Sequence, residues 1–580
     1  MYVRTVKVPS SSGTVNEYVR IVEAYREGGK VKQRVVADLG RKDLLCEVLP
    51  GLRRVLLGEE PKAPGEDDIL DASTWGPVLL VRALFDELGL WAILDRRLGR
   101  ARSDVSYTDR AFVLLANRLI RPKSEHGLAG WLETDYVCTR DGRRFVPQWH
   151  QRRRVRVHHR QLDAWYRTLD RLVAAKNEIE VDLFHRLRDL FHLKPEFVLY
   201  DLTSTYFEGA GDPELCRHGY SRDGKSRNVQ VLVGVVMVAG WPIAHHVFAG
   251  NRQDASTVDE VLGDLKTRFG FERVVFVGDR GMISEETKSQ IKDREQGFLM
   301  GIKRRRNREL DGWLESLDET KWEVCPVGLT ASEKKPPPQT RVQEVESGEE
   351  GLRVFVIDSE ERREYEQAQR ERSMQKTREA LERLQARVAA GRLVRPEKIG
   401  AAAGRVLSRN HGSRYYDWRL RDGSFEFFEH PTHLARERRL EGRYVIATSE
   451  PEITALDAVA QYKELMEVER GFRHLKDVIA LRPIHHRIAP RIEGHIFVAT
   501  LALLLERLLE RRLEEAGLDF SASFALEATS TLRAVTFHVP EGPPRQGTSR
   551  GSPHASQVLN ALKITNRTPP NPPEGQETVL

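Results

Sequence analysis

The chain has few cysteines and no long apolar run, and each shortage excludes a class of protein. Its four cysteines lie far apart and form no Cys-x-x-Cys pair. A disulfide framework and a cysteine-rich zinc site are therefore unsupported, so any metal must be held by oxygen or histidine. No stretch approaches the roughly 18 apolar residues of a membrane helix, and the N-terminus lacks the apolar run of a secretory signal. These absences predict a cytoplasmic protein.

The composition indicates several folded domains and a weak overall preference for polyanions. At 580 residues the chain exceeds the size that one hydrophobic core serves, and about two to four domains are expected. Lys and Arg total 92 against 86 Asp and Glu, a net charge of +6. The cationic residues are clustered, because Arg152, Arg153 and Arg154 begin a run of five arginines within nine residues. Such a run is typical of phosphate contacts, although a solvated face is the alternative.

The first third of the chain divides into two segments. Residues 1–65 alternate apolar and polar positions around Gly28 and Gly29, which predicts a β-hairpin module that ends in a linker at 61–68. Residues 70–190 have helical periodicity, and we interpret them as a DNA-binding region. Within them, 106–120 and 125–133 predict a helix, a short turn and a second helix. This pattern is shared by DNA-reading helix-turn-helix units and by two ordinary packed helices.

From residue 196 the pattern predicts an α/β fold with a mixed sheet of the RNase H-like kind. Three consecutive strands are followed by alternating helix and strand over 196–302, the first part of this core. Residues 303–440 interrupt the alternation with a Pro-rich break, a long charged helix and strand-like pieces, and we interpret them as a β-containing insertion. The core resumes over 441–510. The end of the C-terminal tail, 511–580, is rich in Pro, Gly and Ser and is expected to be loosely ordered around a short helix.

Two aspartates follow apolar strands of this sheet. Asp201 comes after the strand at 197–200, and Asp279 ends the apolar run at 273–278. An Asp at a strand end is commonly a turn residue or a helix cap, so neither is decisive alone. Two carboxylates from neighbouring strands, with a third from a later helix, would supply the oxygen ligands that Mg²⁺ or Mn²⁺ prefers.

The helix expected at about 455–480 offers the third carboxylate, Glu469. At about 100° of rotation per residue, one polar stripe of this helix contains Tyr462, Glu469, Arg473 and Lys476. An adjoining apolar stripe, expected to pack on the sheet, contains Leu465, Val468, Phe472, Leu475 and Ile479. Glu464 and Glu467 point away from the polar stripe and are expected to be solvated. An ordinary amphipathic helix with pairing between Glu469 and Arg473 is the alternative.

Three segments together resemble the acidic motifs of bacterial insertion-sequence DDE transposases. They are LYDLTSTYFEG around Asp201, VGDRGM around Asp279 and YKELMEVERGFRHLK around Glu469. The third is similar to the group whose motif reads Y-x2-R-x3-E-x6-K, with Tyr462, Glu469 and Lys476 on the motif. Leu465 occupies the Arg position, which is a departure from it. GYSRDGK and LRPIHHR also resemble stretches of one branch of these enzymes, and the resemblance spans about 196–510.

The resemblance implies an enzyme that cleaves DNA at the ends of its own mobile element and transfers the ends to target DNA. It implies that Asp201, Asp279 and Glu469 are catalytic and bind two Mg²⁺ or Mn²⁺ ions during in-line attack on a phosphodiester. Arg473, Lys476 and Tyr462 would then contact the DNA backbone near the scissile phosphate, with surface solvation as the alternative.

Further expectations follow from the same resemblance. Similar transposases carry a β-rich domain between the second Asp and the Glu, which agrees with an insertion at 303–440. A homodimer is expected because two element ends must be joined in one complex, and the enzyme would be associated with the nucleoid when bound to DNA. A nuclease of the same fold without strand transfer and an inactive DNA-binding protein are the alternatives.

Other motifs point to less specific roles. Residues 219–226 match the pattern of a nucleotide-binding P-loop, but a strand follows them where a helix is required, so we interpret them as a basic loop near the substrate. Adjacent histidines at 158, 245 and 485 suggest zinc, yet neighbours in a strand point to opposite faces and are better suited to structural roles. Trp418 would either stack on a flipped base or pack within the insertion.

Overall fold

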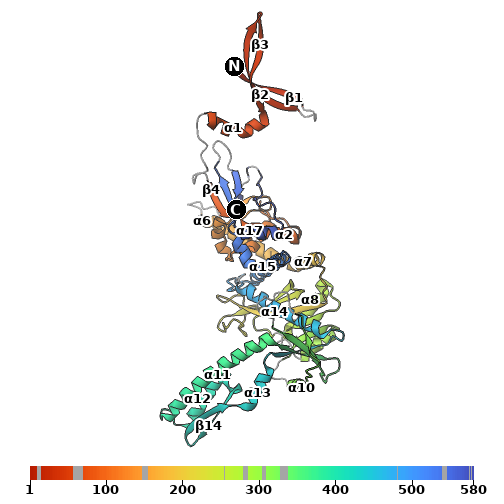
Figure 1. Ribbon diagram of the computed structural model, residues 1–580, viewed down its shortest axis with the longest axis vertical. Coiled ribbons are helices and arrows are strands. Elements are labelled where there is room, and N and C mark those ends of the chain that lie inside the picture. The colour runs from red at the N-terminus through yellow and green to blue at the C-terminus, as the bar shows by residue number, and fades with distance from the viewer. Residues whose placement is uncertain are drawn as a thin grey trace.

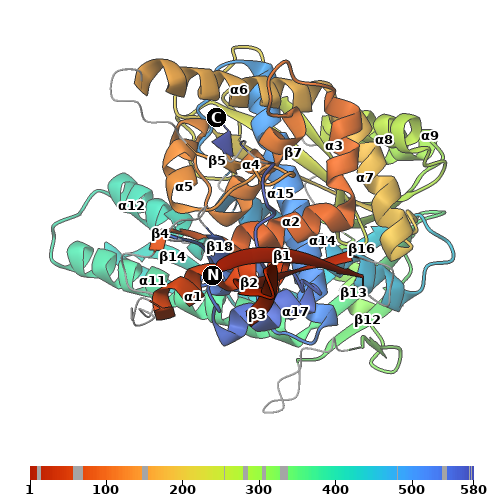
Figure 2. The ribbon, with the colours of Figure 1, turned by 90° about the horizontal axis from the view of Figure 1, so that it is seen from above.

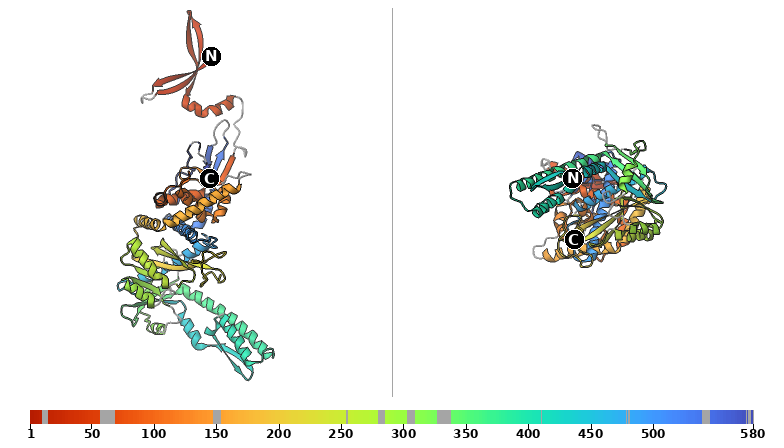
Figure 3. Two further views of the ribbon diagram at one scale, coloured as in Figure 1. Left: turned by 180° about the vertical axis from the view of Figure 1, so that it is seen from behind. Right: turned by 90° about the horizontal axis from the view of Figure 1, so that it is seen from below.

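The molecule is elongated, with a small sheet at one end, a helical arm at the other and the main body between them (Figure 1). Figure 3 shows the same arrangement from behind and from below. The computed structural model describes residues 1–9, 15–56, 69–146, 154–253, 255–278, 285–302, 309–326, 338–409, 411–477, 479, 481–538, 545–573, 575 and 578–579.

The N-terminal end of the molecule is a three-stranded antiparallel sheet in the order β1-β2-β3. Gly28 and Gly29 join β2 to β3 with φ of 59° and 73°, a left-handed conformation that glycine adopts readily in a two-residue hairpin turn. The predicted hairpin is therefore confirmed, whereas the predicted linker at 61–68 lies outside the described residues. The elements are β1 (Tyr2–Pro9), β2 (Val15–Glu27), β3 (Lys30–Arg41) and α1 (Lys42–Leu56).

The following region is mainly helical, as its periodicity predicts. Helix α4 (Tyr107–Ile120) is buried at every residue from Thr108 to Leu119, and the seven-residue α5 (Leu128–Thr134) buries Leu128, Trp131 and Leu132. This pair packs in the core, which favours two ordinary packed helices over a groove-reading unit. The other elements are β4 (Ile69–Thr74), α2 (Gly76–Leu88), α3 (Leu90–Leu98), η2 (Glu125–Gly127), β5 (Arg144–Phe145), α6 (Arg154–Ala174) and α7 (Lys176–Phe191).

The described part of the C-terminal tail is folded against this helical region, so the expectation of loose order is wrong there. Strand β17 (Arg533–Phe537) pairs with β4 on one side and with β18 (Arg545–Thr548) on the other. Helix α17 (Pro553–Ala561) lies where a short helix was expected and buries Val558 and Leu559. The prediction failed because β18 adds to a sheet whose other strand, β4, is distant in the sequence. The remaining elements are α16 (Ala522–Thr529) and β19 (Thr578–Val579), which pairs with β5.

A nine-stranded mixed sheet forms the centre of the molecule, in the order β11-β12-β13-β16-β10-β9-β6-β7-β8. Strand β9 is parallel to both β6 and β10, and the other neighbours are antiparallel. The strands are β6 (Phe197–Tyr206), β7 (Gln230–Val238), β8 (Trp241–Ala249), β9 (Val275–Gly278), β10 (Gly297–Gly301), β11 (Glu323–Val324), β12 (Thr340–Val345), β13 (Arg353–Ser359) and β16 (Arg443–Thr448). This is the mixed α/β architecture that the sequence predicts.

Helices cover both faces of this sheet. Leu199 of β6 belongs to the buried cluster that contains the apolar stripe of α14 (Ala455–Asp477), beside which α15 (Ala489–Glu515) packs. Val198 and Tyr200 belong to the opposite cluster, with α8 (Ala255–Phe269) and α9 (Glu285–Asp293), which lie side by side (Figure 2). None of the described helices is both long and apolar enough to cross a membrane.

Part of the segment 303–440 belongs to the central sheet, so the inserted part of the chain begins later than residue 303, the predicted boundary. Strands β11, β12 and β13 lie within it and extend the sheet at one edge, and the arm begins only at α11. The arm has a small core of its own, which includes Leu381, Ile399 and Phe425. Its elements are α11 (Glu360–Ala389), α12 (Pro396–Arg409), η3 (Gly412–Arg414), β14 (Tyr416–Arg421), β15 (Ser424–Glu429) and α13 (Pro431–Leu440), and α10 (Leu310–Glu315) precedes β11.

Candidate active site

Asp201 lies in the middle of β6, where it is partly buried and opposite Val235 of β7. Its Oδ1 accepts a hydrogen bond of 2.8 Å from the backbone N–H of Leu202. Because side chains alternate along a strand, Asp201 projects from the same face as Leu199. That face is the one covered by α14.

Helix α14 presents the predicted apolar stripe to this face of the sheet. Leu465, Val468, Phe472 and Leu475, together with Ile479 just beyond the helix, are all buried, so the predicted orientation is confirmed. Glu469 is the residue after Val468, and its side chain lies outside the described part of the structure. The side chain of Glu467 also lies outside it.

Glu464 differs from its prediction. It was expected to be solvated, but it is partly buried on α14, and this burial raises the pKa of its carboxyl group. Glu464 lines a cavity of about 650 Å³ together with Phe197 of β6 and Val275 of β9, which explains its partial burial. Leu465, at the Arg position of the family motif, is 3% exposed and packs in the core.

Asp279 and the basic cluster fall largely outside the described residues. The last described residue of β9 is Gly278, and Asp279 follows it. Arg152 and Arg153 precede the described part of α6, and Arg154 is its first residue, with an undescribed side chain. Residues 303–306, which are one Lys and three Arg, are likewise not described.

The other DNA-contact candidates on α14 differ in their exposure. Arg473 is exposed. Tyr462 is partly buried and stacks on Tyr444 of β16, with ring centroids 5.9 Å apart and an interplanar angle of 30°. Trp418 in the arm stacks on Phe425 at 5.6 Å, which favours the packing role over base contact.

Lys476 is not at the surface, because it is part of a buried ion-pair cluster. Its Nζ donates to Oδ1 of Asp223 at 2.8 Å, and Nη1 of Arg482 lies 2.5 Å from the same oxygen. The side chains of Lys476 and Asp223 are only 10% and 5% exposed. Burial lowers the pKa of Lys476, and the carboxylate of Asp223 opposes this effect. We did not predict a role for Asp223; its place in the GYSRDGK segment was the only signal.

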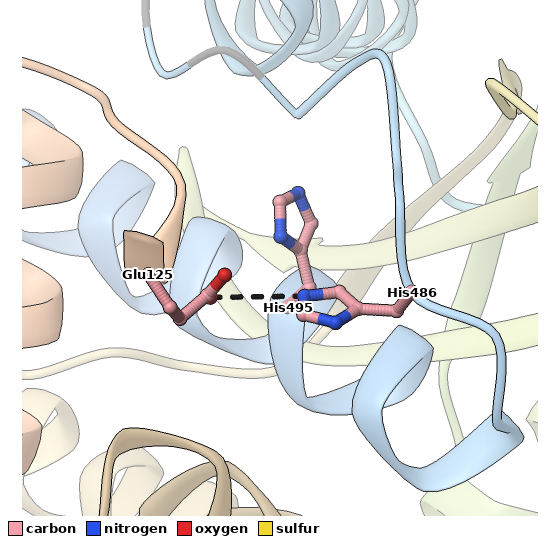
Figure 4. A group of neighbouring side chains, drawn as sticks. All are labelled: Glu125, His486 and His495. Atoms are coloured by element: carbon pink, nitrogen blue, oxygen red, sulfur yellow. Dashed lines mark ion pairs between the residues drawn. The ribbon is translucent and has the colours of Figure 1, made fainter. Parts of the chain in front are cut away.

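Among the described residues, one further group combines possible metal ligands: Glu125 of η2, His486 and His495 of α15. Their ligand atoms lie within 4.8 Å of one another, and Oε1 of Glu125 is 3.7 Å from Nε2 of His486 (Figure 4). However, Nε2 of His495 lies 3.1 Å from the carbonyl oxygen of Leu481, and Nδ1 lies 3.4 Å from the guanidinium of buried Arg118. Both ring nitrogens of His495 are thus engaged.

The charge of this group also opposes a cation. Burial of Glu125 alone would raise its pKa, but the neighbouring His486 and Arg118 outweigh it and lower the pKa to about 2. Burial, with a contribution from Arg118, holds the pKa of His495 well below its ordinary value, so the ring is neutral. The carboxylate therefore balances the buried guanidinium, and the group is suited to joining η2 to α15.

Two family models match the chain. Residues 3–66 match the N-terminal domain of IS1634 family transposases, and residues 192–505, more than half of the chain, match the transposase DDE domain. A search of curated proteins gives no match. Among solved structures, the chain is similar to a cryo-EM structure of the piggyBac transposase synaptic complex with hairpin DNA, at 10% identity and a TM-score of 0.35. The similarity covers 81% of this chain and 82% of the other.

Proposed function

Because the chain belongs to the DDE transposase family, we propose that Asp201, Asp279 and Glu469 form the catalytic centre with which it cleaves DNA and transfers the cut strands. The match to the IS1634 N-terminal domain assigns the enzyme to a bacterial insertion sequence. The chain is a DNA transposase.

The parallel pairing of β6 with β9 is the observation that carries the site assignment. Leu199 lies opposite Val277, and Asp201 and Asp279 follow these two residues by two positions each. A continuation of the pairing beyond Gly278 would bring the two aspartates together. Since both Leu199 and Val277 belong to the cluster covered by α14, alternation directs Asp201 towards that helix, and the continued pairing would direct Asp279 the same way. Glu469, next to buried Val468, supplies the third carboxylate.

We further propose that the core is RNase H-like, that 196–302 and 441–510 are its two parts, and that within the segment 303–440 only the arm from α11 to α13 is inserted outside the sheet. The parallel strands β6, β9 and β10 and the antiparallel β7 and β8 support this assignment. Residues 1–65 and 70–190 would be DNA-binding modules, and 511–580 a tail packed on the second of them. A homodimer would hold the two ends of the element in one complex.

The donor set suits a hard divalent cation, as DDE domains require. Three carboxylates offer only oxygen ligands, and no cysteine lies within the three acidic motifs. Two Mg²⁺ or Mn²⁺ ions, when bound, would polarise the scissile phosphate and stabilise the leaving oxygen. Arg473 and Tyr462 would hold the DNA backbone beside the acids, with Arg152, Arg153 and Arg154 contacting it farther away.

Cleavage and joining of a linear DNA that carries both ends of the element test this function. We expect Mg²⁺-dependent nicks at the ends and covalent products in which cut 3′ ends are joined to a second DNA, both abolished by EDTA. Cleavage without joined products would favour the nuclease alternative. Retained DNA binding without cleavage in Mg²⁺ or Mn²⁺ would favour the inactive DNA-binding protein.

A further inference from the structure

The connection between β6 and β7 presents a basic surface. Between residues 217 and 227 it contains four Arg or Lys residues, one His and a single acid. All four cations are exposed, and Tyr220 is 82% exposed, which is unusual for a large aromatic side chain. No described residue forms an ion pair with Lys225 or Arg227. Positive charge and exposed aromatic rings are features of protein surfaces that bind nucleic acid.

The backbone of this loop is held in place, so its side chains are presented from a defined framework. Arg217 and Gln230 exchange both backbone hydrogen bonds, and Nε2 of Gln230 donates to the carbonyl oxygen of Tyr220 at 2.9 Å. A Cβ at Gly219 would lie 2.0 Å from the carbonyl oxygen of Gly250, so this close approach requires glycine. A preorganised loop loses little conformational entropy when it binds.

The single acid of the loop points inward. Asp223 lies between Lys476 and Arg482, which neutralise its charge, and Arg482 also pairs with Asp477. The backbone N–H of Arg222 donates to Oγ of Ser204 on β6 at 3.0 Å. Removing the acid from the surface in this way leaves the outer side of the loop cationic. It also ties the loop to the helix that carries Glu469.

These anchor points place the loop beside the proposed catalytic centre. Lys476 lies seven residues after Glu469, about 10 Å along α14. Ser204 lies three residues after Asp201, about 10 Å along β6, with its side chain on the opposite face of the sheet. About 10 Å is less than one turn of duplex DNA, so a phosphate backbone at the acids would also reach the loop.

We propose that residues 217–227 form a DNA-binding element of the active site. Lys225 and Arg227 contact phosphates next to the scissile bond, and Tyr220 stacks on a nearby base. Asp223 is a positioning residue, which acts through Lys476 by holding the loop on α14. This inference rests on the proposed function and assigns to Lys476 an indirect role in place of the direct DNA contact that the sequence suggested.

The salt dependence of DNA binding tests the phosphate contacts. For a short fluorescent duplex, Lys225→Ala/Arg227→Ala is expected to reduce the slope of log affinity against log salt by about 2, or about 0.9 per lost contact. The matched control, Lys266→Ala/Lys292→Ala, removes two exposed lysines from α8 and α9 on the opposite face of the sheet and should leave the slope unchanged. Equal slopes for the two double variants would overturn the proposal.

Tyr220 and Asp223 need separate variants. Tyr220→Ala is expected to weaken binding about tenfold, and Tyr220→Phe, which keeps the ring, should restore it. Asp223→Asn and Lys476→Met are each expected to slow cleavage at saturating DNA about tenfold, and the double variant should be no slower than either. The positioning role would be contradicted if the double variant slowed cleavage by the product of the two single effects, or if the single variants cleaved at the native rate.

The two proposals fail in different ways. If Asp201→Asn still cleaves DNA while the loop variants lose affinity, the catalytic assignment is wrong and the loop assignment stands. If Asp201→Asn is inactive and the loop variants bind DNA as the control does, the loop assignment is wrong and the catalytic one stands. Thermal melting of each variant identifies any loss caused by unfolding.

Discussion

Asp201→Asn is expected to lower the rate of DNA cleavage about a thousandfold or more without changing DNA affinity or thermal stability. The substitution removes a negative charge that would hold a divalent cation. Such a cation lowers the activation barrier by several kcal/mol, which corresponds to about a thousandfold in rate. The fold should be kept, because the Oδ1 of Asn can still accept the N–H of Leu202. The rate is measured with DNA carrying the element's ends, under saturating protein.

Asp212→Asn is the control, because Asp212 lies in the connection that follows β6 and its Oδ1 accepts backbone N–H groups, those of Glu214 and Leu215. Its activity should equal that of the native enzyme. Cleavage by Asp201→Asn at more than a tenth of the native rate would exclude Asp201 from the catalytic centre.

Glu180→Ala is expected to destabilise the protein by about 3–5 kcal/mol, the range for removing one partner of a buried ion pair. Glu180 of α7 is 4% exposed and lies 2.9 Å from Lys176, 2.8 Å from Nδ1 of His245 and 2.7 Å from Arg268. Burial lowers the pKa of His245 to about 4, so this ring is neutral and donates its Nδ1–H to the carboxylate. The variant would leave Lys176 without its ion-pair partner and Arg268 with Asp264 alone, at the junction of α7, β8 and α8. Urea unfolding measures the loss.

The exposed neighbour Glu178 provides the control, and Glu178→Ala should change stability by less than about 0.5 kcal/mol. Burial would raise the pKa of Glu180, but Lys176, His245 and Arg268 hold it below its ordinary value of 4.5. Its contribution is therefore complete above about pH 4.5 and lost as the pH falls through the lowered pKa. The difference between native protein and Glu180→Ala should narrow in acid; a difference independent of pH would contradict this ionic account.

Local patterns in the sequence predicted the elements around the proposed site. The apolar runs before Asp201 and Asp279 became β6 and β9, which are neighbours in the sheet, and the period of α14 identified the side that packs on it. These patterns suffice because alternation and helical periodicity are local properties that burial enforces. The family resemblance added the role of the three acids, which periodicity alone does not define.

Contacts between distant segments could not be predicted in this way. Asp223 and Lys476 are 253 residues apart in the sequence. Because they form an ion pair, Lys476 holds the loop at 217–227 and does not make the DNA contact that was expected of it. Strands β12 and β13 joined the sheet although they lie in the expected insertion, and β17 paired with β4 near the other end of the chain. Such pairings depend on which edges the rest of the fold leaves open, and no local pattern encodes them.

The central claim is that the segments around Asp201, Asp279 and Glu469 meet at one divalent-cation site, and localised backbone cleavage by Fe²⁺ tests it most directly. With Fe²⁺ in place of Mg²⁺, ascorbate and peroxide generate hydroxyl radicals that cut the chain only close to the ion. We predict cuts near all three acids, suppressed by excess Mg²⁺ and absent from Glu469→Gln. Cuts confined to other segments, such as those around Glu125 and His486, would contradict the proposed catalytic centre.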